Sequence, residues 1–526
     1  MVNTRWKLLV KNMTMLILIV FTMALFIGIG SANEVKPTYG GTLKVGVYRP
    51  IPSLAYYRSY DVSQNLTTMA IWDTLLQYDE NGNLLPCLAE SWEVPDAKTI
   101  VLHLREGVKF HDGNTMDAED VVASIKFATS PEAKSPMAWM FDSMESIKAL
   151  DNLTVQINLK TPSTVDILYA LATGEGGVTS KEAIKKYGVG LGEHPIGAGP
   201  FKLEKWERGS RAVLVKFDDY WQKGKPYLDK IIFNIIQEEF TNLTSLKSGD
   251  INMAYRISYK NLKLLTNVED ININAFPTYN IYYLALKDNK APFNDVRVRK
   301  ALNYAIDRKA LTEAVTFGYA VPAITGIPPN LAGSLAGIEP LYPYDPKKAR
   351  ELLKEAGYPN GFSFEAIIGA VSPDLETGLV LQRYFKAIGV DLKLVAEEPS
   401  TMWSHLQAGA YKDAAFSFWY PDFPDAMGTL RPFYYSTNAP PEGCCNFSYY
   451  ANKEVDRLLD EAAKETDNER RSKLYIEVNK ILYNDAAKVW LYHVQEALPA
   501  LAKVKGFKAG PMFGFQHLMT DVWLGK

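Results

Sequence analysis

Residues 85–126 read LPCLAESWEVPDAKTIVLHLREGVKFHDGNTMDAEDVVASIK, and this stretch is the most informative part of the chain. Apolar and polar residues alternate from Thr99 to Leu104, as they do in a strand with one buried face. Turn residues at 106–107 and 111–114 enclose a second short strand, predicted at 108–110. Asp117 is a predicted helix N-cap, because acidic residues follow it where the helix dipole favours them. The stretch therefore predicts closely spaced strands and helices, as in an α/β protein.

Length and composition restrict the class of protein. A chain of 526 residues is too long for one hydrophobic core, so two or more domains are expected. Hydrophobic residues make up 47% and charged residues 22%, which is ordinary for a soluble globular protein. The net charge is −3, and it becomes −6 without residues 1–32, since 54 of the 57 basic residues then face all 60 acidic ones. This balance gives no reason to expect nucleic acid or an anionic membrane as a partner.

The N-terminus has the pattern of an export signal. Arg5, Lys7 and Lys11 precede an apolar run from Met15 to Ile29, and small residues end at Ala32. We therefore expect residues 1–32 to be a signal peptide that is cleaved after Ala32, although an uncleaved anchor is the alternative. No cysteine precedes Cys87, so a lipid-modified N-terminus is not expected. The predicted location is periplasmic or cell-surface associated, and the protein is not expected to be a lipoprotein.

The cysteines and histidines give no sign of a metal or cofactor. Three cysteines are too few for a disulfide scaffold. Cys444 and Cys445 could form a vicinal disulfide, one of them could pair with Cys87, or all three could be buried thiols. No zinc spacing is present, and the six histidines are scattered, which leaves nickel binding only as a minor alternative. We expect no cofactor and no metal site.

Several further blocks occur in a recognisable order. They are YGGTLKVG at 39–46, PIGAGPFK at 195–202, PFNDVRVRKALNYAID at 292–307 and YDPKKARELLKEAG at 344–357. In the last block Asp345 is the predicted cap, Pro346 the first helical residue and Gly357 the stop. Together with residues 85–126, these blocks resemble the bacterial family 5 extracellular solute-binding proteins, the peptide, nickel and oligosaccharide receptors of ABC importers.

This resemblance implies an α/β, two-lobed periplasmic-binding-protein fold of the class II or cluster C type, with an additional subdomain in the first lobe. Extended stretches at 279–286 and 489–494 are the expected crossovers between the lobes, and they would act as a hinge that closes on ligand. The expected divisions are residues 33–50, 191–279 and 492–526 for the core of lobe I, 51–190 for the additional subdomain and 280–491 for lobe II.

The resemblance also indicates a ligand site in residues 418–425, FWYPDFPD. Trp419 and Asp422 match a Trp-x-x-Asp motif whose aspartate receives the ligand's α-ammonium group in peptide-binding members, and Asp425 matches a second acidic position. A carboxylate inside a closed cleft is costly alone and strongly stabilised by an ammonium partner. Pro421 and Pro424 would hold the loop in one shape and so reduce the ordering cost of binding. A surface turn with solvated carboxylates is the alternative.

Other candidate contacts are aromatic or lie near the hinge. Tyr420 follows Trp419, Tyr279 and Asn280 begin the first crossover, and Tyr57 lies in a segment that lines the cleft in the family. Each of them could instead be a packing residue. The pair Asp422 and Asp425 could be read as the acid and base of a secreted hydrolase, but no nucleophile or oxyanion donor accompanies it, so no enzyme activity is expected.

The predicted function is therefore that of an extracytoplasmic receptor. It would capture peptides, either oligopeptides or dipeptides, between its lobes and deliver them to the membrane permease subunits of an ABC transporter. A monomer is expected. The alternative of the same fold is an oligosaccharide receptor, in which Trp403, Trp419 and Tyr420 would stack on sugar rings.

Overall fold

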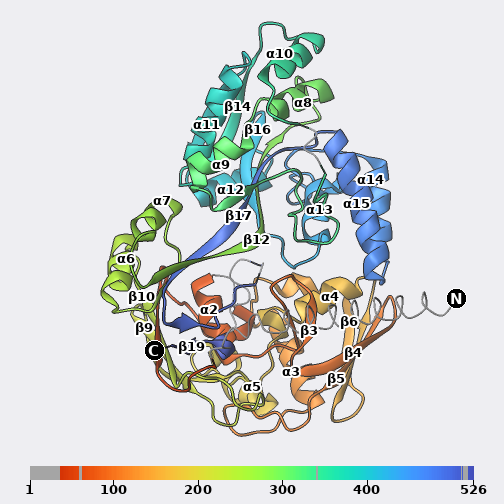
Figure 1. The fold of residues 1–526 in the computed structure, drawn as a ribbon. Coiled ribbons are helices and arrows are strands. Elements are labelled where there is room, and N and C mark those ends of the chain that lie inside the picture. The colour runs from red at the N-terminus through yellow and green to blue at the C-terminus, as the bar shows by residue number, and fades with distance from the viewer. Residues whose placement is uncertain (1–35, 59–61, 339–341, 511, 513–518, 526) are drawn as a thin grey trace, which may run out of the picture. The chain divides into compact units, whose positions relative to one another are not determined.

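Two long antiparallel strands join the two halves of one large sheet (Figure 1). They are β12 (Ile271–Leu286) and β17 (Val489–Leu501), paired from Ile271 with Leu501 to Leu284 with Val489. The computed structural model describes residues 36–58, 62–338, 342–510, 512 and 519–525. Residues 39–526 form one compact unit, and every helix and strand named below belongs to that unit.

The sheet has a distinct set of strands on each side of this pair, and we name the two halves accordingly. The order of strands is β15-β14-β16-β12-β17-β11-β1-β10-β9-β8, and β13 also pairs with β17. Lobe I holds β1 (Thr42–Val47), β8 (Phe201–Glu207), β9 (Arg211–Lys216), β10 (Lys230–Ile235) and β11 (Met253–Ala254). Lobe II holds β13 (Ala320–Pro322), β14 (Ser363–Gly369), β15 (Asp391–Glu397) and β16 (Ala414–Trp419).

Both crossover strands are longer than the stretches predicted from the sequence. β12 begins at Ile271 rather than 279, because residues 271–277 also pair with the end of β17. Every residue of β12 from Thr278 onward is buried, as expected for a strand covered on both faces. The pairing of the two strands shifts register between Pro277 and Ile281 and again between Tyr282 and Tyr283. The two halves of the sheet thus meet at an irregular point.

The helix predicted after Asp345 is confirmed in lobe II. α10 (Pro346–Glu355) begins after Asp345, whose side chain accepts a hydrogen bond from the Lys348 amide, which confirms the predicted cap. α8 (Val296–Tyr304) is capped in the same way by Asp295. The other helices are α9 (Arg308–Thr316), α11 (Asp374–Lys386), α12 (Pro399–Gln407), α13 (Met427–Tyr434), α14 (Lys453–Ala462) and α15 (Asn468–Asn484).

Residues between β1 and β8 build a separate antiparallel sheet. Its strands, in the order β4-β5-β7-β6, are β4 (Ala89–Asp96), β5 (Thr99–Leu104), β7 (Thr154–Leu159) and β6 (Met144–Ala149). The hairpin of β2 (Leu76–Tyr78) and β3 (Leu84–Pro86) and the helices α2 (Val62–Ile71), α3 (Ala118–Ala128), α4 (Thr164–Ala170) and α5 (Lys181–Tyr187) complete this region. Asp117 caps α3 in a reciprocal capping box with Asp120, as the sequence predicts for Asp117.

The predicted strand at 108–110 is wrong. Only one bridge, between Lys109 and Thr115, forms there. The bonds of this bridge run from the Phe110 amide to the Asn114 carbonyl and from the Met116 amide to the Val108 carbonyl. Between them the Gly113 amide donates to the Phe110 carbonyl, and this tight turn limits the pairing to a single bridge.

The remaining elements lie in lobe I and at the C-terminus. They are α6 (Glu239–Ser248), α7 (Tyr259–Leu262), β18 (Val504–Lys505) and β19 (Trp523–Leu524). Among the described residues, no helix is both long and apolar enough to cross a bilayer. The predicted signal peptide at 1–32 lies outside the described residues.

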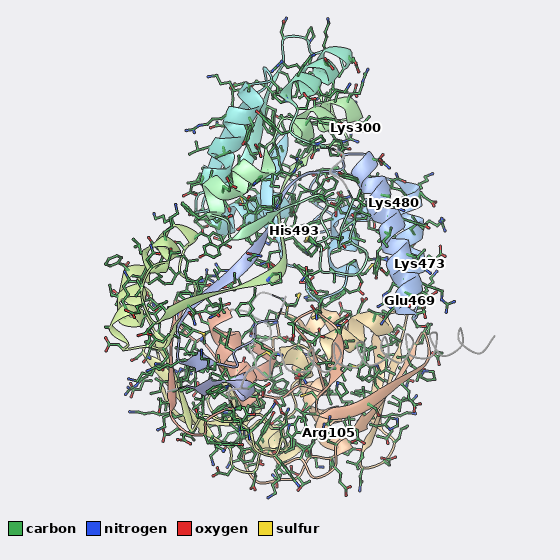
Figure 2. All side chains as sticks on the ribbon, viewed as in Figure 1. Arg105, Lys300, Glu469, Lys473, Lys480 and His493 are labelled. Atoms are coloured by element: carbon green, nitrogen blue, oxygen red, sulfur yellow. A yellow bond between two sulfur atoms is a disulfide. The ribbon has the colours of Figure 1, made fainter. Side chains whose placement is uncertain are left out.

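The largest hydrophobic cluster connects the additional sheet with lobe II. It includes Tyr169 of α4, Phe423, and Tyr475 of α15. The rings of Tyr169 and Phe423 stack with centroids 5.7 Å apart. α15 buries Tyr475 and exposes Glu469, Lys473 and Lys480, which Figure 2 marks along this helix. The segment 419–425 is therefore supported from both sides.

Candidate ligand-binding site

The segment 419–425 leaves the sheet where strands of both halves meet. β16 ends at Trp419, which pairs with Ile281 of β12, and the chain then turns into α13. β16 runs parallel to β14, so both strands end at the same edge of the sheet. Ligand sites of open α/β sheets commonly lie outside such carboxyl ends. We call residues 419–425 the site loop.

Asp422 is a carboxylate without a partner. Its side chain is partly buried, and no described residue gives its carboxylate a hydrogen bond or an ion pair. Burial alone raises the pKa of Asp422 to about 7. A desolvated carboxylate of this kind costs free energy until a cation binds it. The site loop therefore offers one position for a cationic group.

Asp425 is in the opposite situation. Its carboxylate accepts hydrogen bonds from the Tyr475 hydroxyl at 2.7 Å and the Met427 amide at 2.9 Å, and it forms an ion pair with Arg471 at 3.3 Å. Asp425 and Arg471 are only 5% and 7% exposed. Because these partners already satisfy the carboxylate, Asp425 fastens the site loop to α15.

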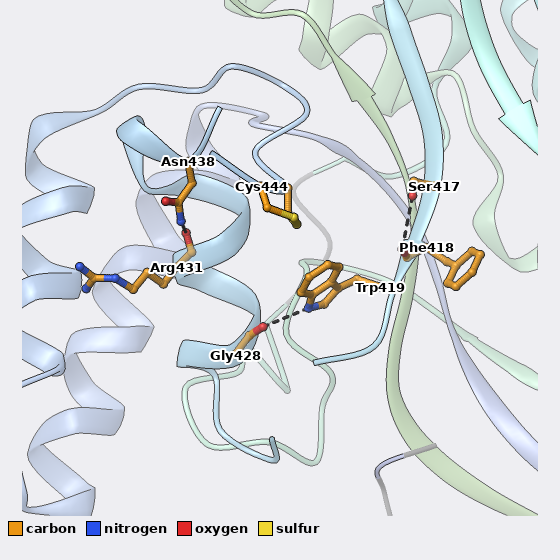
Figure 3. Close-up of a disulfide and its surroundings, with 8 residues drawn as sticks. Ser417, Phe418, Trp419, Gly428, Arg431, Asn438 and Cys444 are labelled. Atoms are coloured by element: carbon orange, nitrogen blue, oxygen red, sulfur yellow. Dashed lines mark hydrogen bonds between the residues drawn. A yellow bond between two sulfur atoms is a disulfide. The ribbon is translucent and has the colours of Figure 1, made fainter. Parts of the chain in front are cut away.

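Trp419 holds the other end of the site loop. Its indole N–H donates to the Gly428 carbonyl at 3.0 Å, as Figure 3 shows. The ring packs on Phe433 of α13 with centroids 5.1 Å apart, yet part of it stays exposed. The Trp419 ring is thus fixed in position and can still offer an apolar surface to a ligand.

Tyr420 extends toward lobe I. Its hydroxyl hydrogen-bonds the guanidinium of Arg256, which lies two residues after β11. Glu496 of β17 lies close to the same guanidinium, and burial raises the pKa of Glu496 to about 7 even though Arg256 and Tyr255 oppose that shift. The site loop is thus linked to a charged cluster formed by lobe I and the crossover strand.

Arg256 and Glu496 were not predicted from the sequence. The only available signal is that each is a charged residue within an apolar run, NMAYRIS at 252–258 and VQEALPAL at 494–501. Such a residue suggests a function only when the fold shows that both runs reach the same edge of the sheet.

The remaining predicted contacts are buried in this structure. Tyr279 is fully buried and donates its hydroxyl hydrogen to the Asn81 carbonyl at 2.7 Å. Asn280 is 2% exposed, within the register shift of β12. Tyr57 lies in the core of lobe I, with its ring edge-to-face with Tyr56 at 5.0 Å. All three are packing residues here and offer a ligand no exposed surface.

Two of the three cysteines are joined to each other. Cys444 and Cys445 form a vicinal disulfide in the segment that follows α13 (Figure 3). Cys87 is a buried free thiol, and burial raises its pKa well above the ordinary value. The described part of the chain contains no group of three or more histidine, cysteine or acidic residues placed to hold a metal ion.

Comparison with known proteins places this architecture in a family. Residues 83–441 match the model of the bacterial extracellular solute-binding proteins, family 5. The chain belongs to this family. A glutathione-binding protein of Shigella flexneri is 32% identical over 487 residues, which cover 91% of this chain and 94% of the relative. The family and this relative are solute-binding proteins and not enzymes.

Solved structures of similar proteins agree with the fold. HbpA2 from Haemophilus parasuis has a TM-score of 0.84 and 26% identity, and the match covers 92% of this chain and all of HbpA2. DppA from Helicobacter pylori, solved in complex with the peptide STSA, has a TM-score of 0.74 and 28% identity over 94% of this chain and all of DppA. The protein therefore has the two-lobed fold of periplasmic binding proteins.

Proposed function

We propose that the protein is the extracytoplasmic receptor of an ABC importer and that it captures short peptides. The α-ammonium group of the peptide pairs with Asp422. One observation carries this proposal. Asp422 is a desolvated carboxylate without a partner, in a loop that Trp419 and Asp425 hold in place through hydrogen bonds. The names of the relatives support it, since one is a glutathione-binding protein and another was solved with a bound peptide.

The surroundings of Asp422 suit recognition of a peptide by its end. Trp419 and Asp425 hold the loop through bonds to α13 and α15, so little conformational entropy is lost when a ligand binds. A charge-assisted bond between ammonium and carboxylate is stronger than a neutral one. Recognition of the charged end and the main chain leaves side chains free to vary, so one site can accept many sequences.

The proposal includes a partner and a location. The receptor acts outside the cytoplasm as a monomer and delivers its ligand to permease subunits in the membrane. The apolar run and small residues at 1–32 support export. Membership of a family of extracellular solute-binding proteins supports the same location.

The contacts that the aromatic side chains already make within the protein favour a peptide ligand over an oligosaccharide. Stacking on a sugar needs a free ring face, and the Trp419 ring, which packs on Phe433 and whose N–H is already bonded, offers only the part that stays exposed. Trp403 of α12 packs against Phe447, with centroids 5.7 Å apart. The unpaired carboxylate of Asp422 has no such internal partner.

A double-mutant cycle tests the ammonium position. Calorimetry measures the binding of trialanine and N-acetyl-trialanine to the wild type and to Asp422→Asn, which keeps the shape and removes the charge. Acetylation should weaken peptide binding to the wild type by roughly thirty-fold or more. It should weaken binding to the variant much less, because acetylation and the substitution remove the same interaction. Glu469→Gln, an exposed charge change on α15, is the matched control and should behave as the wild type. Equal binding of both peptides to the wild type would contradict the ammonium position and favour the alternative of an oligosaccharide receptor.

A further inference from the structure

A cavity of about 530 Å³ lies between lobe II and the region of the additional sheet. From the region of the additional sheet, it is lined by Trp139 of the 3₁₀ helix η2 (Ala138–Phe141) and by Asp166 of α4. From lobe II, it is lined by Phe423 of the site loop and by residues of α13 and α14. Asp422 does not line it, so the cavity does not contain the proposed ammonium position. Its size suits a small molecule, and we call it the Asp166 cavity.

Asp166 brings an unpaired carboxylate to this cavity. Its side chain is partly buried, and no described residue gives the carboxylate a hydrogen bond or an ion pair. Burial raises the pKa of Asp166 to about 6, and the nearby charge of Asp425 acts in the same direction. A desolvated carboxylate without a partner costs free energy, and a bound cation would offset that cost.

The cationic side chains of the protein near this carboxylate do not pair with it. Arg431 of α13 forms an ion pair with Asp460 of α14 at 3.2 Å. Arg471 of α15 pairs with the second acidic residue of the site loop, as described above. Lys464 also lines the cavity, but its side chain is exposed and forms no ion pair with Asp166. The negative charge of Asp166 is therefore left for a ligand.

The ring of Trp139 gives the cavity an apolar face. Trp139 is 45% exposed, although tryptophan is a residue that proteins bury to a large extent. Phe423 adds a second ring from lobe II, and it is held by its stacking on Tyr169 at 5.7 Å. Aromatic rings attract both apolar groups and cations. Rings and a carboxylate that line one cavity therefore suit a cation with an apolar body.

We propose that the Asp166 cavity is a second ligand site, which binds a small organic cation, an ammonium or guanidinium group on an apolar body. Asp166 pairs with the cationic group, and Trp139 packs on the body. The inference goes beyond the proposed function and does not depend on it, because the two positions use different carboxylates. A ligand held there contacts both the region of the additional sheet and lobe II, so its binding stabilises their contact.

The test uses two probes of the same shape, phenethylammonium and the uncharged 2-phenylethanol, and calorimetry measures the binding of each. The wild type should bind the cation about ten-fold or more tightly than the alcohol, because only the cation can pair with Asp166. In Asp166→Asn, which keeps the shape and removes the charge, this preference should fall below about three-fold. Glu145→Gln is the matched control. It removes one exposed negative charge from β6, in the same region of the protein, and should keep the preference of the wild type.

Two further variants locate the ligand. Trp139→Ala should weaken the binding of both probes by about five-fold or more, because it removes the apolar face and leaves the carboxylate in place. Asp422→Asn should bind phenethylammonium as the wild type does, since Asp422 does not line the cavity. Thermal melts of each variant confirm that it is folded.

The outcomes separate this inference from the proposed function. The inference is overturned if the wild type binds neither probe or binds both equally, or if Asp166→Asn keeps the full preference for the cation. Loss of phenethylammonium binding in Asp422→Asn but not in Asp166→Asn would place the amine at the proposed ammonium position and equally overturn it. If trialanine fails to bind the wild type, the proposed peptide function fails, and the result for phenethylammonium at Asp166 still stands.

Discussion

Asp422 and Asp425 lie in one short loop and have opposite environments. Asp425 is satisfied by Tyr475, Arg471 and a backbone amide, whereas the carboxylate of Asp422 is desolvated without compensation. A buried charge that lacks a partner reduces stability, and natural proteins retain such costs mainly at functional sites. The contrast supports the proposal that Asp422 binds the ligand, while Asp425 fastens the loop.

Peptide affinity should depend on pH through Asp422. Its pKa is about 7 in the free protein, and an ammonium partner favours the charged form, so binding releases a proton at lower pH. Affinity for trialanine should therefore rise up to about ten-fold per pH unit below pH 7 and level off above it. Titration calorimetry between pH 5 and pH 8 tests this. The slope should be much reduced in Asp422→Asn, and an equal slope in that variant would contradict the assignment.

Removing the charge of Asp422 should increase the stability of the ligand-free protein. The folded-state pKa of about 7 lies above the ordinary value of 3.8, so the native state holds the proton more tightly. The stability linked to this group is fully present below pH 3.8 and is lost as pH rises through about 7. Ligand-free Asp422→Asn should thus be more stable than the wild type at pH 8, by on the order of 1–3 kcal/mol. Urea unfolding at pH 5 and pH 8 should show the difference growing with pH.

At the scale of elements, the site loop depends on the pair of Asp425 and Arg471. Arg471→Met should lower the free energy of unfolding by about 3–5 kcal/mol, because it leaves a buried carboxylate with an unpaired charge. Arg457→Met is a suitable control, since Arg457 forms exposed ion pairs with Glu454 and Glu461 on α14 and its loss should change the stability little. Chemical denaturation measures both. Equal effects would mean that Asp425 does not fasten the loop.

The elements differ in how well the sequence predicts them. α10 was predictable because its cap, its first proline and its apolar spacing are all local signals. The strand predicted at 108–110 was wrong because the chain turns tightly at 110–113 and only one bridge forms across that turn. The partners of Asp425 and the position of Arg256 were beyond prediction, since Arg471 lies 46 residues further along the chain and Arg256 reaches Tyr420 only through the fold. Local sequence patterns predict helices and strands. They do not predict which residues, distant in the sequence, come into contact in the folded protein.

At the scale of the whole molecule, we expect the lobes to close on ligand around the crossover strands. The register shifts of β12 against β17 lie between Pro277 and Ile281 and between Tyr282 and Tyr283, where regular pairing is interrupted. Such interruptions are natural hinge points. Small-angle scattering should show a smaller radius of gyration with saturating trialanine than without it. An unchanged profile at proven saturation would count against a hinge.

The mature chain should begin at Asn33. The apolar run and the small residues that end at Ala32 predict cleavage there. Intact-mass measurement on protein secreted by its own host tests this expectation. A full-length chain in the membrane fraction would show instead that the leader is retained.

The pairing of β12 with β17 also determines when the chain can fold. The Asn274 side chain bonds the Leu498 carbonyl across 224 residues, and β11 pairs with Ala500. The sheet of lobe I therefore cannot be completed until nearly the whole polypeptide has been synthesised. Long-range pairing of this kind slows folding, because much loop-closure entropy must be lost first. For the exported receptor proposed above, that delay would keep the polypeptide unfolded during translocation and postpone assembly until after export.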